Sequence, residues 1–172
     1  GTCDVRGHLA YSSSADGWLV AADDLVLSTD AGTWPESSLR FETSTDDDGT
    51  IVIVDAMASY LNLADAAAIA PWLPAAQSGA LDRWNPDGII TNLQATLSDL
   101  DTDAPRYALS AEMTRVGIAP DGNRPGLRGF TGNLRADHDG GLVEIRSAGA
   151  MLELPAWLNA PVPVDGAGGP VI

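Results

Sequence analysis

The sequence predicts a mostly β fold, an antiparallel sheet built from repeated hairpins. One observation is a polar turn that ends in Asp-Gly and leads into apolar residues, which occurs at Asp16, Asp48 and Asp139. Asp-Gly between alternating segments is a strong hairpin signal, because glycine accepts positive φ without a Cβ clash. The other is strict alternation of apolar and polar residues, the pattern of half-buried strands. Together they indicate hairpins joined in series.

The second and third Asp-Gly turns begin a longer internal repeat. Residues 48–63 and 139–154 align without a gap, at an offset of 139 − 48 = 91 residues. Repetition of this kind favours an architecture whose function is spread along the chain. The matched apolar pairs are Ile51 and Leu142, Val54 and Ile145, Leu61 and Leu152, and Leu63 and Leu154.

The first part of the chain, 4–58, reads as two hairpins. Leu9 and Tyr11 are predicted to share one face opposite Arg6 and His8. A helical connection is expected over 63–86, where an Ala-rich segment begins at Leu63 and ends before Pro71, and a second helical turn follows. We expect Trp157, beside Pro155, to anchor its connection onto the sheet, and Trp34 to be free in a loop.

The remaining strands are expected within 88–154, roughly at 88–98, 106–116, 127–136 and 141–146. Glycines inside or beside strands, such as Gly129 and Gly132, allow a sheet to bend. The predicted organisation is a single β-rich domain over 1–160. Residues 161–172 have the composition of a linker or of the start of a next segment.

Composition excludes several classes of function. The chain has 172 residues with 9 basic and 24 acidic side chains, a net charge of −15, which repels phosphate backbones, so we expect no nucleic-acid partner. The single cysteine, Cys3, forms no disulfide within the chain. No apolar run approaches the length of a transmembrane helix. The beginning of the chain lacks Met and a signal-peptide pattern, so we expect an internal piece of a longer protein.

The motif search predicts no catalytic residue, no cofactor and no metal site. No nucleophile elbow, zinc-protease motif or phosphate-binding loop is present. His8 and His138 are expected to be surface histidines. The alternating carboxylates Asp99, Asp101 and Asp103 resemble the start of a calcium loop, but Ala104 and Ser110 occupy its required Gly and Glu positions. A solvated loop is the prediction for this segment.

Two interpretations of the apolar face remain open. In one, it forms the core of a closed β-sandwich, a structural or adhesive module without a lipid ligand. In the other, the sheet is open and curved, and its apolar face binds a long apolar ligand. Composition does not separate the two, although the glycines within strands favour curvature.

Several segments resemble the YhdP-type proteins of the AsmA-like superfamily. One is Trp84-Asn85-Pro86-Asp87-Gly88-Ile89-Ile90-Thr91-Asn92-Leu93. Another is Pro125-Gly126-Leu127-Arg128-Gly129-Phe130-Thr131-Gly132-Asn133-Leu134, which is followed by Gly140-Gly141-Leu142-Val143-Glu144-Ile145 and Leu154-Pro155. The resemblance covers nearly the whole chain.

The resemblance implies a periplasmic protein of Gram-negative bacteria, anchored in the inner membrane by a helix outside this fragment. It implies an open, taco-like β-groove that carries phospholipids toward the outer membrane, and no enzymatic activity. The expected partners are phospholipid acyl chains and neighbouring segments of the same full-length protein. Alternation alone nominates the lipid-binding residues, which are Leu93, Leu97, Leu109, Met113, Phe130, Leu134, Val143 and Ile145.

Overall fold

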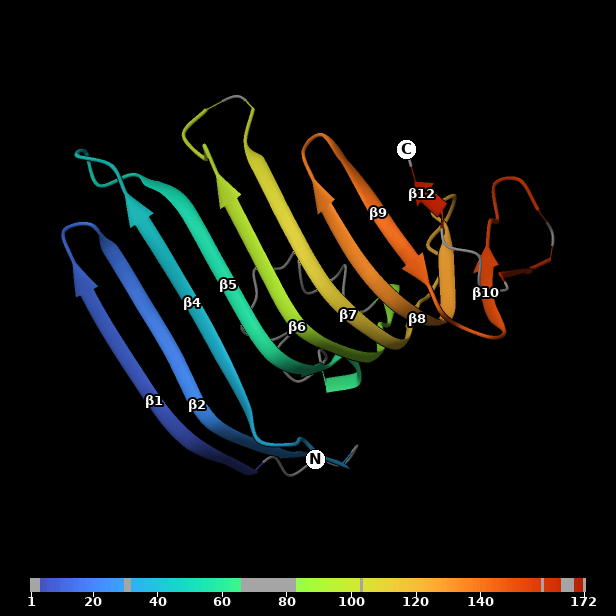
Figure 1. The fold of residues 1–172 in the computed structure, drawn as a ribbon, viewed down its shortest axis with the longest axis horizontal. Helices are drawn as coiled ribbons and strands as arrows, with labels where there is room; N and C mark the ends of the chain where they lie inside the picture. Colours follow the sequence, from blue (N-terminus) through green and yellow to red (C-terminus); the bar gives the residue numbers. More distant parts are fainter. Residues whose placement is uncertain are drawn as a thin grey trace.

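The computed structural model describes residues 4–29, 32–65, 83–102, 104–158, 160–164 and 169–171. These residues form one open antiparallel sheet (Figure 1). Its strand order runs from β1 to β11, and these two ends do not pair with each other. The predicted fold, a curved antiparallel sheet of repeated hairpins, is therefore confirmed, and the closed β-sandwich is wrong.

The sheet contains twelve strands. Their bounds are β1 Asp4–Ser14, β2 Gly17–Thr29, β3 Gly32–Thr33, β4 Ser37–Thr45, β5 Ile51–Asn62, β6 Asp87–Ser98, β7 Arg106–Ile118, β8 Gly126–Asp137, β9 Gly140–Ile145, β10 Ala150–Glu153, β11 Val162–Val164 and β12 Gly169–Val171. From β1 to β9 each long strand lies beside the next one in the sequence. This order is what hairpins joined in series produce.

The three Asp-Gly turns lie at hairpin tips between β1 and β2, β4 and β5, and β8 and β9. In the second, the Asp46 carboxylate accepts the backbone N–H groups of Asp48 and Thr50, at 3.0 and 2.8 Å. In the third, Asp137 accepts those of Asp139 and Gly140, at 2.9 and 3.1 Å. These aspartates satisfy turn backbone that has no strand partner, which explains why the turns are rich in Asp.

The two copies of the internal repeat differ in their second halves. In the first copy, β5 is continuous from Ile51 to Asn62. In the second, β9 ends at Ile145 and β10 begins at Ala150, after Gly149 with a φ of 83°. Because of this break, β9 pairs with the end of β8 near the hairpin tip, while β10 pairs with its start.

The helical connection is described only at its two ends. Leu63–Asp65 forms a 3-10 helix, η1, where the sequence predicts the start of an α-helix. Residues 66–82 lie outside the described part of the chain, and with them most of both expected helices. Within 161–172, β11 pairs with β10 and β12 pairs with β9. The sheet thus continues beyond residue 160, and the predicted division into a domain and a linker stays a prediction.

The strands bend in their lower halves in Figure 1. Bulges accompany this bend: Asp24, Asn92 and Arg115 have φ values of 52°, 53° and 50°. The registers shift at these places in β1–β2, β6–β7 and β7–β8. An extra residue in one strand of a pair bends that strand and strengthens its twist. Bulges on several strands therefore give the sheet its curvature.

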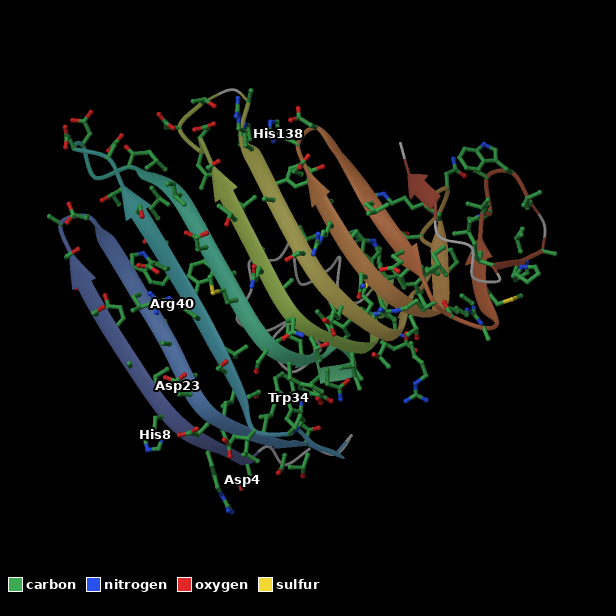
Figure 2. All side chains as sticks on the ribbon, in the orientation of Figure 1. Asp4, His8, Asp23, Trp34, Arg40 and His138 are labelled. Atoms are coloured by element: carbon green, nitrogen blue, oxygen red, sulfur yellow. The ribbon has the colours of Figure 1, made fainter. Side chains whose placement is uncertain are left out.

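No second layer of described residues covers the sheet. Among the described residues, none with a large side chain is fully buried, and few apolar side chains are buried at all. The edge strand β1 is exposed along its whole length, with Leu9 at 77% and Tyr11 at 67%. Figure 2 shows Asp4 and His8 on this strand at the rim of the molecule. A sheet without a packed core leaves apolar surface in contact with solvent.

Candidate functional site

Strand register aligns apolar side chains in rows that cross the sheet. Cα partners in neighbouring strands point to the same face of a sheet. A row of successive partners runs from β1 to β9, and we call it the central apolar row. Its members are Tyr11, Val20, Phe41, Ala56, Ala95, Leu109, Ala136 and Gly141.

Three further rows flank the central apolar row on the same face. Nearer the hairpin tips lie Ser13, Trp18, Thr43, Val54, Leu97 and Tyr107. Trp18 stacks on Phe41 of the central row, with ring centroids 5.2 Å apart and planes at 23°. Farther from the tips, one row crosses the first strands and another the last ones. These residues are Leu9, Ala22, Leu39, Ala58 and Leu93, and then Ala111, Leu134 and Val143.

The opposite face of the same strands is mainly polar. Its middle row, the central polar row, consists of Ala10, Ala21, Arg40, Met57, Gln94, Ser110, Arg135 and Leu142. Hydrogen bonds join side chains across this face, such as Thr96 to Asp55 at 2.6 Å and Asn133 to Glu144 at 3.0 Å. The apolar rows therefore lie on one face of the sheet, and these hydrogen bonds between polar side chains lie on the other.

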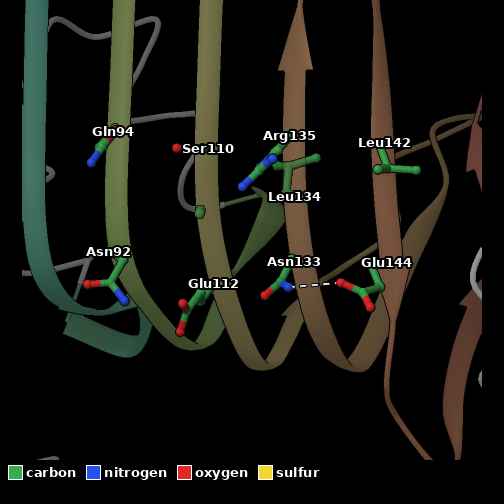
Figure 3. Close-up of a pocket in the computed structure, with 10 residues that line it drawn as sticks. Asn92, Gln94, Ser110, Glu112, Asn133, Leu134, Arg135, Leu142 and Glu144 are labelled. Atoms are coloured by element: carbon green, nitrogen blue, oxygen red, sulfur yellow. Dashed lines mark hydrogen bonds between the residues drawn. The ribbon is translucent and has the colours of Figure 1, made fainter.

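Figure 3 views the sheet from its polar face, with Gln94, Glu112 and Asn133 toward the viewer. Below these residues the strands turn away from the viewer and continue behind the sheet. The sheet therefore bends away from its polar face, so that the apolar face lies on the inner side of the bend. The arrangement is an open groove with an apolar floor.

The structure places the nominated residues on the apolar face, by register or by alternation along their own strands. Leu97 pairs with Val54 and Tyr107 and is 44% exposed, while Phe130 is only 4% exposed. Phe130 pairs with Val116 at the bend, and both side chains are buried. The other six are half-buried floor residues, which are Leu93, Leu109, Met113, Leu134, Val143 and Ile145.

The sequence did not predict a buried polar contact between Trp34, which follows β3, and Asp65 of η1. Trp34 is 8% exposed, packs against Tyr60 and donates its indole N–H to Asp65 at 2.7 Å. The Thr29 hydroxyl donates to the same carboxylate at 2.8 Å. The expectation that Trp34 is free is wrong, because a partner 31 residues away in the sequence holds it. Trp157 is 79% exposed, so the expectation that it anchors its connection onto the sheet is also wrong.

Two hollows on the polar face are lined by the described residues of neighbouring strands, and neither lining matches a catalytic motif. One of about 450 Å³ lies among polar side chains, including Asn92, Glu112 and Asn133 (Figure 3). A second, of about 590 Å³, adjoins it near Thr96 and Asp137. Each lies between the long side chains of one sheet face, so neither forms an enclosed active-site cavity.

The histidines and acidic turns lie at the surface. His8 contacts Asp24 at 3.2 Å, and both side chains are exposed. Asp137, His138 and Asp139 hold possible ligand atoms within 4.8 Å of one another, but the carboxylate of Asp137 already accepts two turn N–H groups. At the predicted solvated loop, Asp99 pairs with Arg106 at 3.3 Å, and Asp103 is outside the described residues.

Comparison with known proteins gives one match. Neither the curated proteins nor the solved structures contain a match. No helix within the described ranges is long and apolar enough to cross a membrane. The family model described as "YhdP protein" matches residues 4–171, nearly the whole chain. YhdP and its AsmA-like relatives are a lipid-transport family of the bacterial envelope. With its open β-sheet and its match over 4–171, this chain belongs to the YhdP family of AsmA-like proteins.

Proposed function

We propose that this chain is an internal segment of a periplasmic bridge-like protein whose groove carries phospholipids between the inner and outer membranes. The full-length protein would be anchored in the inner membrane, and neighbouring segments of it would extend the groove. Family membership and the open antiparallel sheet support this proposal. The acyl chains are the ligand, and no catalytic step is involved.

The observation that carries the proposal is an apolar face that no second layer of described residues covers. Large apolar side chains on it remain open to solvent, including Phe41, Leu97 and Tyr107. Extended apolar surface on a soluble domain marks a binding site. Each acyl CH₂ group that leaves water for this floor gains about 0.8 kcal/mol.

The rows also suit movement of the ligand. The central apolar row crosses the strands from β1 to β9, about 34 Å at ~4.8 Å per strand. Its side chains are all apolar, with no charged group along it. An acyl chain that lies along the row therefore meets similar contacts at each step, and it can slide without breaking a strong specific bond.

The test compares two adjacent residues on opposite faces of β7. Leu109→Glu places a carboxylate on the floor, whereas Ser110→Glu places the same group on the polar face. The purified proteins are incubated with phosphatidylethanolamine and phosphatidylglycerol vesicles, and bound lipid is counted by native mass spectrometry. We expect Leu109→Glu to reduce loading by at least about tenfold, because an unpaired charge under an acyl chain costs more than the about 1–3 kcal/mol of an unpaired neutral polar group. Ser110→Glu should load like the unmodified chain.

Equal loading of both variants would reject the floor as the lipid site. Absence of lipid from the unmodified chain, after exposure to both vesicle types, would reject the groove function for this segment. Circular dichroism of each variant confirms that the sheet has formed before loading is compared. Leu109 is preferred to Phe130 as the target, since Phe130 is buried and its replacement would disturb folding.

A further inference from the structure

The apolar face of the groove changes in character between the hairpin tips and the bend. The row nearer the tips, which we call the tip-side row, consists of Ser13, Trp18, Thr43, Val54, Leu97 and Tyr107. Its hydroxyl groups and its indole N–H make this row amphipathic. The rows farther from the tips, which begin at Leu9 and at Ala111, contain only aliphatic side chains. The floor is therefore graded across its width, from a mixed row near the tips to aliphatic rows at the bend.

Trp18 and Tyr107 combine a large apolar ring with a hydrogen-bond donor. Trp18 stacks on Phe41 of the central apolar row, and Tyr107 is 46% exposed. No described residue accepts a hydrogen bond from the indole N–H of Trp18 or from the hydroxyl of Tyr107. Amphipathic rings of this kind favour the boundary between lipid chains and hydrated head groups. Because they lie on β2 and β7, they offer separate donors to a lipid that moves along the row.

The hairpin tips beside this row are acidic. They lie along the upper edge of the sheet in Figure 1. Asp16 precedes Trp18 by two residues, and Asp99 follows Leu97 by two. Among the described tip residues, the basic side chains are Arg106, which contacts Asp99 at 3.3 Å, and His138, which contacts Asp139 at 3.4 Å. The potential at this edge is therefore negative. The described acidic residues of the tips are Asp16, Asp46 to Asp48, Asp99, Asp101, Asp137 and Asp139.

We propose that the groove selects phospholipids whose head group carries an amine, and that this head group lies over the tip-side row. The inference rests on the proposed function, because it requires acyl chains on the apolar floor. The aliphatic rows hold the acyl chains, and the mixed row meets the glycerol and the phosphate. An amine at the outer end of the head group then faces the acidic tips.

The two polar parts of such a head group match two different features of this edge. Phosphate oxygens accept hydrogen bonds, which Trp18 and Tyr107 can donate from the floor. The ammonium group is attracted by the carboxylates of the tips beyond them. A head group with a phosphate and no amine meets only repulsion, since its charge has the same sign as the tips. A zwitterionic lipid is therefore favoured over an anionic one.

Competition between two phospholipids tests the selection. The purified chain is incubated with vesicles that contain equal parts of phosphatidylethanolamine and phosphatidylglycerol. Native mass spectrometry then counts both lipids on the same protein. We expect about fivefold more bound phosphatidylethanolamine at low ionic strength, which corresponds to one close charge pair in water. The preference should shrink at high salt, since exposed charges are screened.

Neutralising the tips identifies the residues responsible. Asp16→Asn with Asp101→Asn removes two exposed carboxylates that have no ion pair with a described residue. The control, Glu36→Gln with Glu112→Gln, removes the same charge from the opposite end of β4 and from the polar face, where both side chains are also exposed. We expect the tip variant to reduce the preference to about twofold. The control should retain the preference of the unmodified chain.

Photocrosslinking locates the head group on the floor. Benzoylphenylalanine replaces Tyr107 in the tip-side row or Leu93 in a row nearer the bend. Each protein is loaded with phosphatidylethanolamine, irradiated, and analysed by mass spectrometry to locate the crosslinked lipid carbon. We expect bonds to glycerol or head-group carbons at position 107 and to acyl carbons at position 93.

The outcomes separate the selection from the groove itself. Equal binding of the two lipids, or an excess of phosphatidylglycerol, overturns the selection while bound lipid still supports the groove. Equal preferences in the tip variant and its control also overturn it, because the tip charges would then have no part in it. Head-group bonds at position 93 instead of position 107 overturn the placement over the tip-side row. Absence of both lipids from the unmodified chain overturns the proposed function together with this inference.

Discussion

The central apolar row and the central polar row use the same strands and differ by one residue in each. Leu109 belongs to one row and Ser110 to the other, as do Ala95 and Gln94. On one side Trp18 and Phe41 stack, and on the other Arg40 pairs with Glu42 at 2.8 Å. The side chains are therefore mainly apolar on one face of the sheet and more polar on the other.

This difference shows how a single sheet can have one apolar face and one polar face without enclosing a core. In a two-layer domain, the apolar faces of two layers cover each other. Here the apolar face bends inward and stays open to whatever enters the groove. Hydrogen bonds between strands and polar contacts on the outer face must hold the sheet together. The polar contacts and the proposed binding surface thus lie on different sides of the same strands.

The largest expected effect comes from adding a side-chain atom where β8 and β9 lie close together on the apolar side. A Cβ on Gly132 would lie 2.0 Å from the Glu144 carbonyl oxygen. We expect Gly132→Ala to lower the free energy of unfolding by about 3 kcal/mol, because the backbone of β9 must move. Gly140→Ala is the control, with no atom within 4 Å of the added Cβ. Urea denaturation of both variants measures the difference, and equal stabilities would contradict the close contact.

Making the polar face apolar should abolish the asymmetry between the faces. Gln94→Leu with Arg135→Leu would leave Ser110 as the single polar side chain between Met57 and Leu142 in this row on the outside. We expect self-association, driven by about 2 kcal/mol for each leucine that becomes buried. Sedimentation velocity should show loss of the monomer. The control, Gln94→Asn with Arg135→Lys, should sediment like the unmodified chain, and a monomeric leucine variant would refute the expectation.

Pairwise contacts on the two faces should differ in strength and in salt dependence. A double-mutant cycle of Trp18→Leu and Phe41→Leu is expected to give a coupling energy of about 1 kcal/mol, unaffected by salt. The cycle of Arg40→Ala and Glu42→Ala should give about 0.5 kcal/mol at low salt and less at high salt, because both side chains are nearly half exposed. Chemical denaturation at two ionic strengths measures both cycles. Similar salt dependence on the two faces would contradict this assignment.

The smallest expected effect concerns the hairpin tips, which lie between the faces. Calcium should not raise the melting temperature, because the Asp99 carboxylate contacts Arg106 and turn backbone uses those of Asp46 and Asp137. Differential scanning fluorimetry across a calcium titration measures the shift. A rise that grows with calcium concentration would reveal a site, since a ligand that binds only the folded state stabilises it.

The hairpins and the sidedness of the strands could be predicted because they depend on local pattern. Alternation from Tyr107 to Met113 predicts the apolar face of β7, and the structure places this strand at Arg106–Ile118. The Asp-Gly turns mark their tips, since glycine and aspartate act within a few residues. The resemblance added the open groove, which periodicity alone could not distinguish from a closed sandwich.

Features that depend on distant partners could not be predicted. Asn92 and Arg115 adopt positive φ at bulges, although neither is glycine, and no local signal marks them. The Trp34 contact needs Asp65, far along the chain. The second copy of the repeat is broken between β9 and β10, whereas the first copy forms the continuous strand β5. The spacing of apolar residues could not predict this difference, because it is compatible with a continuous strand and with an interrupted one. Phe130 fits the alternation, yet the bend buries it.

The absence of a second layer over the described sheet has a consequence for size. A packed core fixes how large a domain can be, because every added element must fit the volume already enclosed. A single curved layer has no such limit, and one more hairpin would lengthen its floor by about 10 Å without repacking the rest. The length of such a protein can therefore grow by duplication of a unit, as residues 48–63 and 139–154 illustrate within this chain.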